Sequence, residues 1–238
     1  MENRSLTLNT GRNMRGIDLP RQIGTLIDGY LEMQTVYKSA ICEVSTKLEI
    51  LNEEFNMRHR RNPIHHMQSR LKSPESILKK LMRKGLEASV DSARRNLTDI
   101  AGIRVVCCYI EDIYTVASLL EKQDDVTVLR VTDYIKNPKE SGYRSLHLIA
   151  DVTVHLSSGV QKARCEIQLR TIAMDSWATL EHQLRYKSKG TVSAEVANDL
   201  VKCSEMLFAS DLKMQQIAET LGVFEQISRG PESIKFFR

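Results

Sequence analysis

Residues 160–170 hold the densest set of side chains that could do chemistry, because charged and apolar residues alternate there. Successive side chains of an extended strand point to opposite faces. One face therefore carries Lys162, Arg164, Glu166, Gln168 and Arg170, and the other carries Ala163, Cys165, Ile167 and Leu169. A carboxylate, an amide and two guanidinium groups on one surface could grip phosphates and accept a proton. A solvated antiparallel sheet shows the same alternation, so this strand alone does not decide between the two interpretations.

The stretch SGYRSLH at 141–147 leads into a second strand, 144–156. Gly142 frees the backbone to turn, and Tyr143 adds a flat aromatic ring beside it. The turn Ser157-Ser158-Gly159 predicts a hairpin between 144–156 and 160–170. One face of the second strand has Ser145, His147 and Asp151, and the other has Leu146, Leu148, Ala150 and Val152. We expect the two polar faces to lie on the same side of the sheet, with His147 beside the charged face of 160–170.

Asp99-Ile-Ala-Gly102-Ile-Arg104 places a carboxylate at the start of a third, β-branched strand. An Asp and a Glu from different strands make a reasonable Mg²⁺ site, since this ion takes a few carboxylates together with phosphate oxygens and water. Asp99 and Glu166 are the candidate pair, and Gly102 would allow close backbone approach. The alternative is an aspartate that caps a turn and an arginine paired across the sheet.

Positive charge is concentrated between Arg58 and Lys84, which contains nine Lys or Arg residues and one acid, Glu75. The chain has neither a G-x-x-x-x-G-K-[ST] loop nor a G-x-G-x-x-G motif. A nucleotide phosphate would then be held by individual lysines and arginine forks, for which the segment around Arg70 and Lys72 is the candidate. A solvated basic helix face is the ordinary interpretation of such a run.

Composition is that of a globular protein of 238 residues, with 42% hydrophobic and 27% charged residues and a net charge of +4. No apolar run approaches the roughly 18 residues of a membrane span, and no signal peptide is evident, so we expect a cytoplasmic protein with neither a DNA nor a membrane partner. Five cysteines without a C-x-x-C pair are expected to be buried, reduced thiols.

Hydrophobic periodicity predicts an α+β fold: a mixed sheet of about five strands flanked by helices. Helices are expected at 19–57, 73–84, 112–123, 171–186 and 193–221, and strands at 100–110, 126–131, 144–156 and 160–170. The expected organisation is a flexible segment 1–18, a catalytic domain 19–190 with its N-terminal helices, and a C-terminal helical extension 191–238. Apolar surplus on the terminal helices predicts self-association.

Five motifs taken together resemble the synthetase domain of RelA/SpoT homologues, in order and spacing from 62 to 187. They are Arg70-Leu-Lys72-Ser-Pro-Glu-Ser76, Asp99-Ile-Ala-Gly-Ile-Arg104, Lys139-Glu-Ser-Gly-Tyr143-Arg-Ser-Leu-His147, Glu166-Ile-Gln168-Leu-Arg170-Thr and Trp177-Ala-Thr-Leu-Glu181-His182. The chain has no His-Asp dipeptide, the mark of the family's hydrolase domain. It therefore resembles the monofunctional small alarmone synthetases, and 62–66 with 81–85 favours the RelP-like over the RelQ-like branch.

This resemblance implies a nucleotidyltransferase-like fold that transfers the β,γ-pyrophosphate of ATP to the 3′-hydroxyl of GDP or GTP, releasing AMP, in the stringent response. By motif position, Asp99 and Glu166 would bind Mg²⁺, and Glu166 would be the base. ATP would contact Arg70, Lys72, Ser76, Lys80, Arg83 and Arg104. The guanine nucleotide would contact Lys139, Tyr143, His147, Gln168 and Arg170, with Arg144 and Glu181 elsewhere in the pocket. The resemblance also implies a homotetramer.

Two other functions stay open at this point. The basic segment and a sheet with Tyr143 as a stacking platform would suit a non-catalytic RNA-binding module. Asp99 and Glu166 speak against it, because unneutralised carboxylates repel a phosphate backbone. The other possibility is a pyrophosphokinase of the same fold with a different acceptor.

Overall fold

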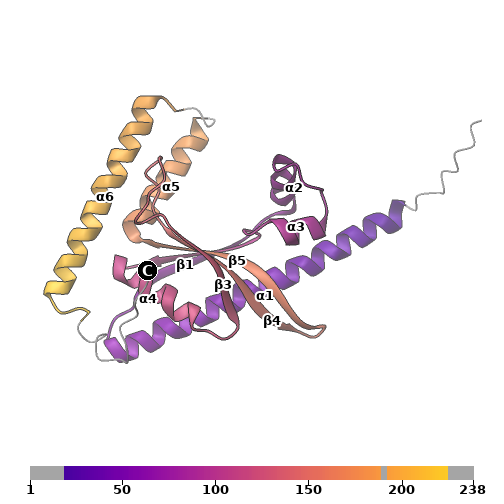
Figure 1. Ribbon diagram of the computed structural model, residues 1–238, viewed down its shortest axis with the longest axis horizontal. Helices are drawn as coiled ribbons and strands as arrows, with labels where there is room; N and C mark the ends of the chain where they lie inside the picture. Colours follow the sequence, from indigo (N-terminus) through magenta and orange to yellow (C-terminus); the bar gives the residue numbers. More distant parts are fainter. Residues whose placement is uncertain (1–18, 189–191, 225–238) are drawn as a thin grey trace, which may run out of the picture.

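The computed structural model describes residues 19–188 and 192–224, which form one five-stranded sheet and its flanking helices (Figure 1). The segment 1–18, expected to be flexible, lies outside the described residues. The elements are α1 (Leu19–His59), β1 (Ile64–Leu71), α2 (Pro74–Arg83), α3 (Val90–Asn96), β2 (Ala101–Cys107), α4 (Ile110–Glu121), β3 (Val126–Asp133), β4 (Leu146–Leu156), β5 (Gly159–Thr171), α5 (Ile172–Lys187) and α6 (Ala194–Thr220).

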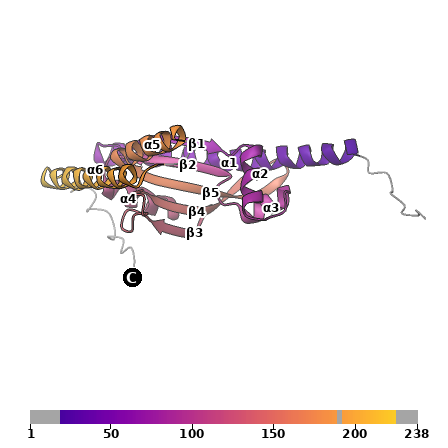
Figure 2. The same ribbon diagram turned by 90° about the horizontal axis from the view of Figure 1, so that it is seen from above.

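The sheet has the strand order β1-β2-β5-β4-β3, which Figure 2 shows from above. β2 and β5 run parallel, whereas the other three neighbouring pairs are antiparallel. β4 and β5 form the predicted hairpin, in which Leu156 pairs with Gly159 across the turn. The expected mixed sheet within an α+β fold is therefore confirmed. Its central strand, β5, carries Glu166, and the neighbouring strand β2 carries Arg104.

One face of the sheet packs against α1 and α4 and forms the core. Helix α1 contributes buried residues at three- and four-residue steps, so one stripe of the helix meets the sheet. The sheet contributes the apolar positions of the alternating strands. The cluster includes Met33, Val36, Ala40, Val44 and Leu48 of α1, Ile113 and Leu120 of α4, and Ile103, Leu148, Ile167 and Leu169 of the sheet. The opposite face is left for polar side chains.

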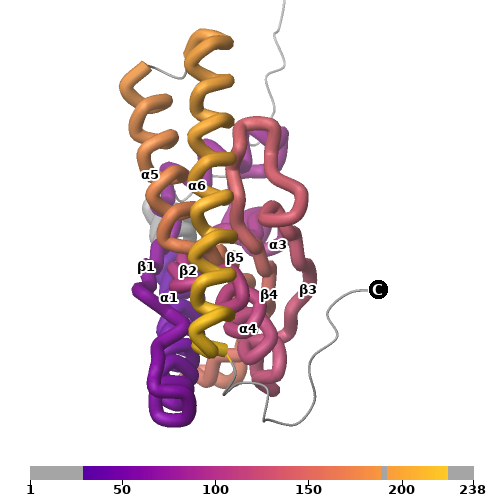
Figure 3. Tube along the Cα trace, turned by 90° about the vertical axis from the view of Figure 1, so that its left-hand side faces the viewer, coloured from indigo at the N-terminus to yellow at the C-terminus, as the bar shows by residue number. Residues whose placement is uncertain are grey.

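Two helices project from one end of the sheet. α5 follows β5 directly, and α6 packs along α5, so that the two lie side by side (Figures 1 and 3). The indole nitrogen of Trp177 in α5 donates to the backbone oxygen of Leu200 in α6 at 2.9 Å. Ser193 caps α6 and Gly222, with φ of 70°, follows its end, both as the sequence indicates.

The sequence analysis missed β1 and α3. β1 is an edge strand in which only Ile64 is buried, so its neighbours His65 and His66 show no alternation of apolar and polar residues. α3 has seven residues, which is too short for a periodic pattern, and its start is marked only by the cap at Ser89. Helix α4 begins at Ile110, two residues before the predicted start.

All five cysteines are free thiols. Cys107 and Cys165 are buried in the core as expected, but Cys42 and Cys203 are exposed, so the expectation of burial was wrong for these two. They lie on the outward sides of long helices, where periodicity alone does not separate a small apolar residue from a solvent-facing one. Within the described ranges, no helix is both long and apolar enough to cross a bilayer.

Candidate active site

The register of the sheet gathers the predicted chemistry on the face away from α1. Arg104 of β2 lies opposite Gln168 of β5, which in turn lies opposite His147 of β4. In the next row, Gly102 lies between Arg70 and Glu166. Residues opposite one another in paired strands project to the same side. The polar faces of β4 and β5 therefore coincide, as predicted.

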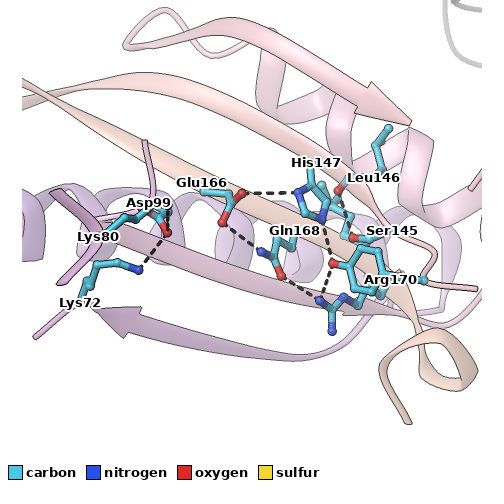
Figure 4. Close-up of polar contacts among 11 residues, drawn as sticks. Lys72, Lys80, Asp99, Ser145, Leu146, His147, Glu166, Gln168 and Arg170 are labelled. Atoms are coloured by element: carbon cyan, nitrogen blue, oxygen red, sulfur yellow. Dashed lines mark hydrogen bonds and ion pairs between the residues drawn. The ribbon is translucent and has the colours of Figure 1, made fainter. Parts of the chain in front are cut away.

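Five side chains on this face close a ring of contacts, most of which Figure 4 draws as dashed lines. Nδ1 of His147 lies 3.4 Å from a carboxylate oxygen of Glu166, and Nε2 lies 2.8 Å from the hydroxyl of Tyr143. Arg170 donates to that hydroxyl at 2.6 Å and to the side-chain oxygen of Gln168 at 2.9 Å. The amide of Gln168 donates to Glu166 at 3.0 Å. Each member thus restrains its two neighbours.

Donor and acceptor chemistry allows one consistent set of hydrogen bonds around this ring when His147 is neutral. Arg170 can only donate, so the oxygen of Tyr143 accepts from it and the hydroxyl proton can point to Nε2 of His147. A neutral His147 then carries its proton on Nδ1, facing Glu166. In this arrangement, Glu166 only accepts hydrogen bonds. Its carboxylate can therefore accept a further one from a bound ligand.

Asp99 lies close to this ring, at the N-terminal end of β2. One of its oxygens, Oδ2, accepts from Lys72 at 2.9 Å and lies 2.7 Å from Nζ of Lys80 (Figure 4). The other oxygen, Oδ1, is buried and has no hydrogen-bond partner within the part of the chain that the structure describes. A buried carboxylate oxygen with free lone pairs suits a cation ligand.

The two carboxyl groups are ionised at neutral pH. Burial alone would raise the pKa of Asp99, but the hydrogen bonds and charges of Lys80 and Lys72 outweigh it and lower the pKa. Burial likewise opposes ionisation of Glu166, whereas His147 and Gln168 lower its pKa overall. The negative charge of Asp99 acts in the opposite direction on Glu166. A cation between the two carboxylates would remove this repulsion.

An aspartate that the sequence analysis did not single out joins two predicted site residues. Oδ1 of Asp175, in the first turn of α5, lies 3.0 Å from Arg170 and 3.4 Å from Arg104. The Arg170 side chain is only 5% exposed. Asp175 therefore neutralises the buried guanidinium of Arg170 and links this β5 residue to Arg104 of β2. Its signal in the sequence is its position four residues after Thr171, where the predicted helix starts, but a first-turn acid also has a purely helical explanation.

The loop before β4 presents an aromatic cluster. Tyr143 packs edge-on against Tyr134 and His147, with ring centroids 6.0 and 5.7 Å away. The ammonium of Lys139 lies 4.8 Å from the centre of the Tyr143 ring, and the guanidinium of Arg170 lies 5.0 Å from it. Tyr134 was not named as a site residue, although it directly follows β3. Aromatic and cationic groups in this arrangement can bind a purine and its phosphates.

A family model described as a region found in RelA / SpoT proteins matches residues 69–191. The chain belongs to the RelA/SpoT family. Every residue of the ring lies within the matched range, as do Asp99, Lys72, Lys80 and Asp175. The resemblance on which the site residues were chosen is therefore confirmed.

Similar proteins place the chain among the small members of this family. The curated protein GTP pyrophosphokinase YwaC of Bacillus subtilis (strain 168) is 43% identical over 190 residues, which cover 80% of this chain and 90% of that protein. The crystal structure of small alarmone synthetase 2 from B. subtilis has a TM-score of 0.72 at 43% identity, covering 79% of this chain and 97% of that one. Small alarmone synthetase 1 from B. subtilis, bound to its product pppGpp, has a TM-score of 0.74 at 34% identity, covering 80% and 97%. The placement in the RelP-like branch stays a prediction.

The remaining residues named for this RelA/SpoT site are spread around the ring. Ser76 lies in the first turn of α2, Lys80 lies in its last turn, and Arg83 is exposed at its end. Arg70 is exposed on edge strand β1. A Cβ on Gly102 would lie 3.7 Å from the backbone oxygen of Arg70, an ordinary contact, so the protein's own packing does not require glycine there. Because Gly102 has no side chain, the surface of the sheet between Arg70 and Glu166 is left uncovered at that position.

Two residues named for the pocket make their contacts elsewhere. Arg144 donates to the backbone oxygen of Ile135 at 2.7 Å and stacks on the ring of Phe208 in α6. Glu181 pairs with Arg185, one turn further along α5. Within the described residues, neither side chain hydrogen-bonds to or pairs with a member of the ring, so motif position alone did not separate binding groups from supporting ones.

Proposed function

We propose that this protein is a (p)ppGpp synthetase, which transfers the β,γ-pyrophosphate of ATP to the 3′-hydroxyl of GDP or GTP and releases AMP, as part of the stringent response. The observation that carries the proposal is the position of Glu166, a half-buried carboxylate held by His147 and Gln168 beside a second carboxylate and two lysines. The relative YwaC is named GTP pyrophosphokinase, and the similar structure of small alarmone synthetase 1 is bound to its product pppGpp.

The acceptor nucleotide would bind at the Tyr143 side of the ring. The Tyr143 ring would stack on guanine, and the cations Lys139 and Arg170 beside that ring would meet the acceptor phosphates. His147 and Gln168 would position the ribose next to Glu166. Because the contacts of the ring hold these side chains in place, little ordering is needed when the acceptor binds.

ATP would bind at the β1–β2 side. Arg70 and Arg104 would hold the adenine between them, and Lys72, Ser76, Lys80 and Arg83 would hold the phosphates. Lys72 and Lys80 both contact Asp99, so the donor phosphates would lie next to the same carboxylate. Point charges of this kind replace the glycine-rich loop that the chain lacks.

Asp99 and Glu166 would together hold Mg²⁺. The buried, unbonded Oδ1 of Asp99 fits a cation, and no group of three or more His, Cys, Asp or Glu side chains in the described residues could hold a metal on its own. Two carboxylates plus phosphate oxygens match the preference of Mg²⁺. When bound, the ion would neutralise phosphate charge and make the attacked phosphorus more electrophilic.

The reaction follows from these positions. The 3′-oxygen of the acceptor forms a bond to the β-phosphorus of ATP, and the bond from that phosphorus to the oxygen bridging to the α-phosphate breaks. This oxygen leaves with AMP. Glu166, ionised because His147 and Gln168 lower its pKa, accepts the 3′-hydroxyl proton. Lys72 and Lys80 stabilise the charge that develops on the transferred group. Positioning and charge neutralisation supply most of the acceleration in phosphoryl transfer.

We further propose a cytoplasmic homotetramer with a catalytic part, 19–190, and a C-terminal helical part from 191 onward. Exposed apolar side chains on α5 and α6 support self-association, because monomeric proteins rarely expose large apolar patches. They include Leu180, Leu184, Tyr186, Met206, Leu212 and Met214. Sedimentation as a monomer at micromolar concentration would contradict this part.

The function is tested by incubating purified protein with Mg²⁺, γ-labelled ATP and one acceptor at a time. GDP and GTP should yield labelled ppGpp and pppGpp, whereas ADP should yield no labelled tetraphosphate. Transfer to ADP but not to a guanine nucleotide would favour the pyrophosphokinase with a different acceptor. No transfer at all, together with RNA binding that depends on salt but not on Mg²⁺, would favour the RNA-binding module.

A further inference from the structure

Helix α6 lies outside the range 69–191 matched by the family model, yet it contacts the residues on both sides of Tyr143. The hydroxyl of Ser204 donates to the backbone oxygen of Gly142. The ring of Phe208 lies 3.9 Å from the guanidinium carbon of Arg144. Ser204 and Phe208 are four residues apart, so they lie on the same side of α6.

Both the backbone N–H and the backbone oxygen of Gly142 are hydrogen-bonded. Its N–H donates to the oxygen of Lys139 at 2.8 Å, and its oxygen accepts from Ser204. Gly142 has φ of 88°, a conformation that residues with a Cβ rarely adopt. A Cβ there would lie 3.0 Å from Cβ of Ser204 and 3.2 Å from Cα of Val201. The loop therefore sits directly against the surface of α6.

The other side of Tyr143 is held in the same way. Arg144 stacks on Phe208 while one of its nitrogens donates to the backbone oxygen of Ile135 at 2.7 Å. Arg144 thus links α6 to the chain that follows β3. Tyr143 lies between two residues that α6 restrains, and only its side chain reaches the polar ring through His147 and Arg170.

We propose that Ser204 is a positioning residue for the acceptor nucleotide: through Gly142 it fixes the direction in which Tyr143 presents its ring. This inference rests on the proposed function, in which Tyr143 stacks on guanine. Because Tyr143 meets the acceptor and not ATP, loss of the Ser204 hydroxyl weakens acceptor binding selectively. Phe208 acts on the same loop from the Arg144 side.

The test is steady-state kinetics of Ser204→Ala with ATP and with GDP or GTP varied separately. We expect the KM for the acceptor to rise about fivefold, the effect of losing a hydrogen bond of about 1 kcal/mol, while the KM for ATP stays unchanged. The matched control is Ser210→Ala, which removes the same group from an exposed position on the same helix and should change neither constant.

A second readout separates positioning from general damage to the fold. Trp177, the one tryptophan of the chain, bonds to α6, so its fluorescence reports whether α5 and α6 remain packed. We expect the Ser204→Ala spectrum to match that of the wild type. Phe208→Leu keeps an apolar side chain but removes the aromatic face under Arg144, and it should show the same selective rise in the acceptor KM.

Three results are informative. A selective rise in the acceptor KM with unchanged Trp177 fluorescence supports the inference. An unchanged acceptor KM in both Ser204→Ala and Phe208→Leu, or equal rises for ATP and acceptor, overturns it while the proposed function stands. A wild-type protein that transfers nothing to guanine nucleotides overturns both.

Discussion

Arg170, near the end of β5, donates a hydrogen bond of 2.6 Å to the hydroxyl of Tyr143, which precedes it by 27 residues. The same guanidinium is bonded to Gln168 and paired with Asp175. Tyr143 is therefore held at its hydroxyl by the sheet, and the residues on either side of it, Gly142 and Arg144, are held by α6. An aromatic ring fixed at both ends is suited to stacking, because the acceptor base does not have to order it.

Tyr143→Ala should raise the acceptor KM strongly, since it removes the stacking surface, an effect of about 1–3 kcal/mol for a nucleobase. Tyr143→Phe keeps the ring and loses only the hydroxyl bonds to Arg170 and His147, so its effect should be smaller. Val160→Ala, at an exposed apolar position next to the turn between β4 and β5, is the control and should behave like the wild type. The measurement is acceptor KM at saturating ATP. A wild-type acceptor KM in Tyr143→Ala would rule out stacking.

Lys72→Met and Lys80→Met should each raise the KM for ATP by roughly tenfold and leave the acceptor KM nearly unchanged. Both ammonium groups lie within 3 Å of Oδ2 of Asp99, so removing either one also takes a positive charge from the donor phosphates. Lys79→Met is the matched control, because Lys79 pairs with Glu75 on the exposed side of α2. Equal effects at Lys79 and Lys80 would contradict a specific phosphate site.

Asp175→Asn should impair the use of both substrates. The substitution is nearly isosteric but removes the charge that neutralises buried Arg170 and the nearby Arg104. We expect a loss of about 1–3 kcal/mol in the free energy of unfolding and a lower kcat/KM for ATP and acceptor alike. Asp199→Asn, at an exposed position of α6, is the control. An effect on stability without any change in kcat/KM would reduce Asp175 to a structural residue.

The acid dependence of stability should report the lowered pKa of Glu166. A carboxyl whose pKa is lower in the folded protein stabilises the fold above its ordinary value of 4.5, and this contribution is lost as the pH falls through the folded pKa. Urea unfolding of wild type and Glu166→Gln should therefore show a constant difference above about pH 5.5, and the wild type should lose stability relative to the variant below about pH 4.5. A relative gain for the wild type on acidification would contradict this.

The sequence predicted the strands in which apolar and polar residues alternate between the two faces. The shared polar face of β4 and β5 followed from that alternation and from the short turn at Ser157-Ser158. It did not predict β1, whose exposed edge position leaves a single buried residue, Ile64. Local patterns describe a strand's two faces, but they do not describe which strands neighbour one another. The parallel pairing of β2 with β5, which brings Gly102 beside Glu166, joins two strands that are far apart in the sequence, so no local pattern predicts it.

The site was predictable where a motif marks the residue and missed where tertiary packing decides. Glu166, His147 and Gln168 were named from motifs, and the structure brings them into direct contact. Asp175 looked like an ordinary first-turn acid of a helix. Ser204 lies in an amphipathic helix 62 residues from Gly142, its hydrogen-bond partner, and no local pattern indicates such a contact.

The most direct test of the central claim follows AMP and (p)ppGpp together in one reaction of ATP, Mg²⁺ and GDP or GTP, for wild type and for Glu166→Gln. We expect the wild type to release AMP and guanine product in equal amounts and to stop when Mg²⁺ is chelated. Glu166→Gln should form neither product while its circular dichroism spectrum is unchanged. Near-normal turnover by Glu166→Gln would remove this carboxylate from the mechanism and contradict the function built around it.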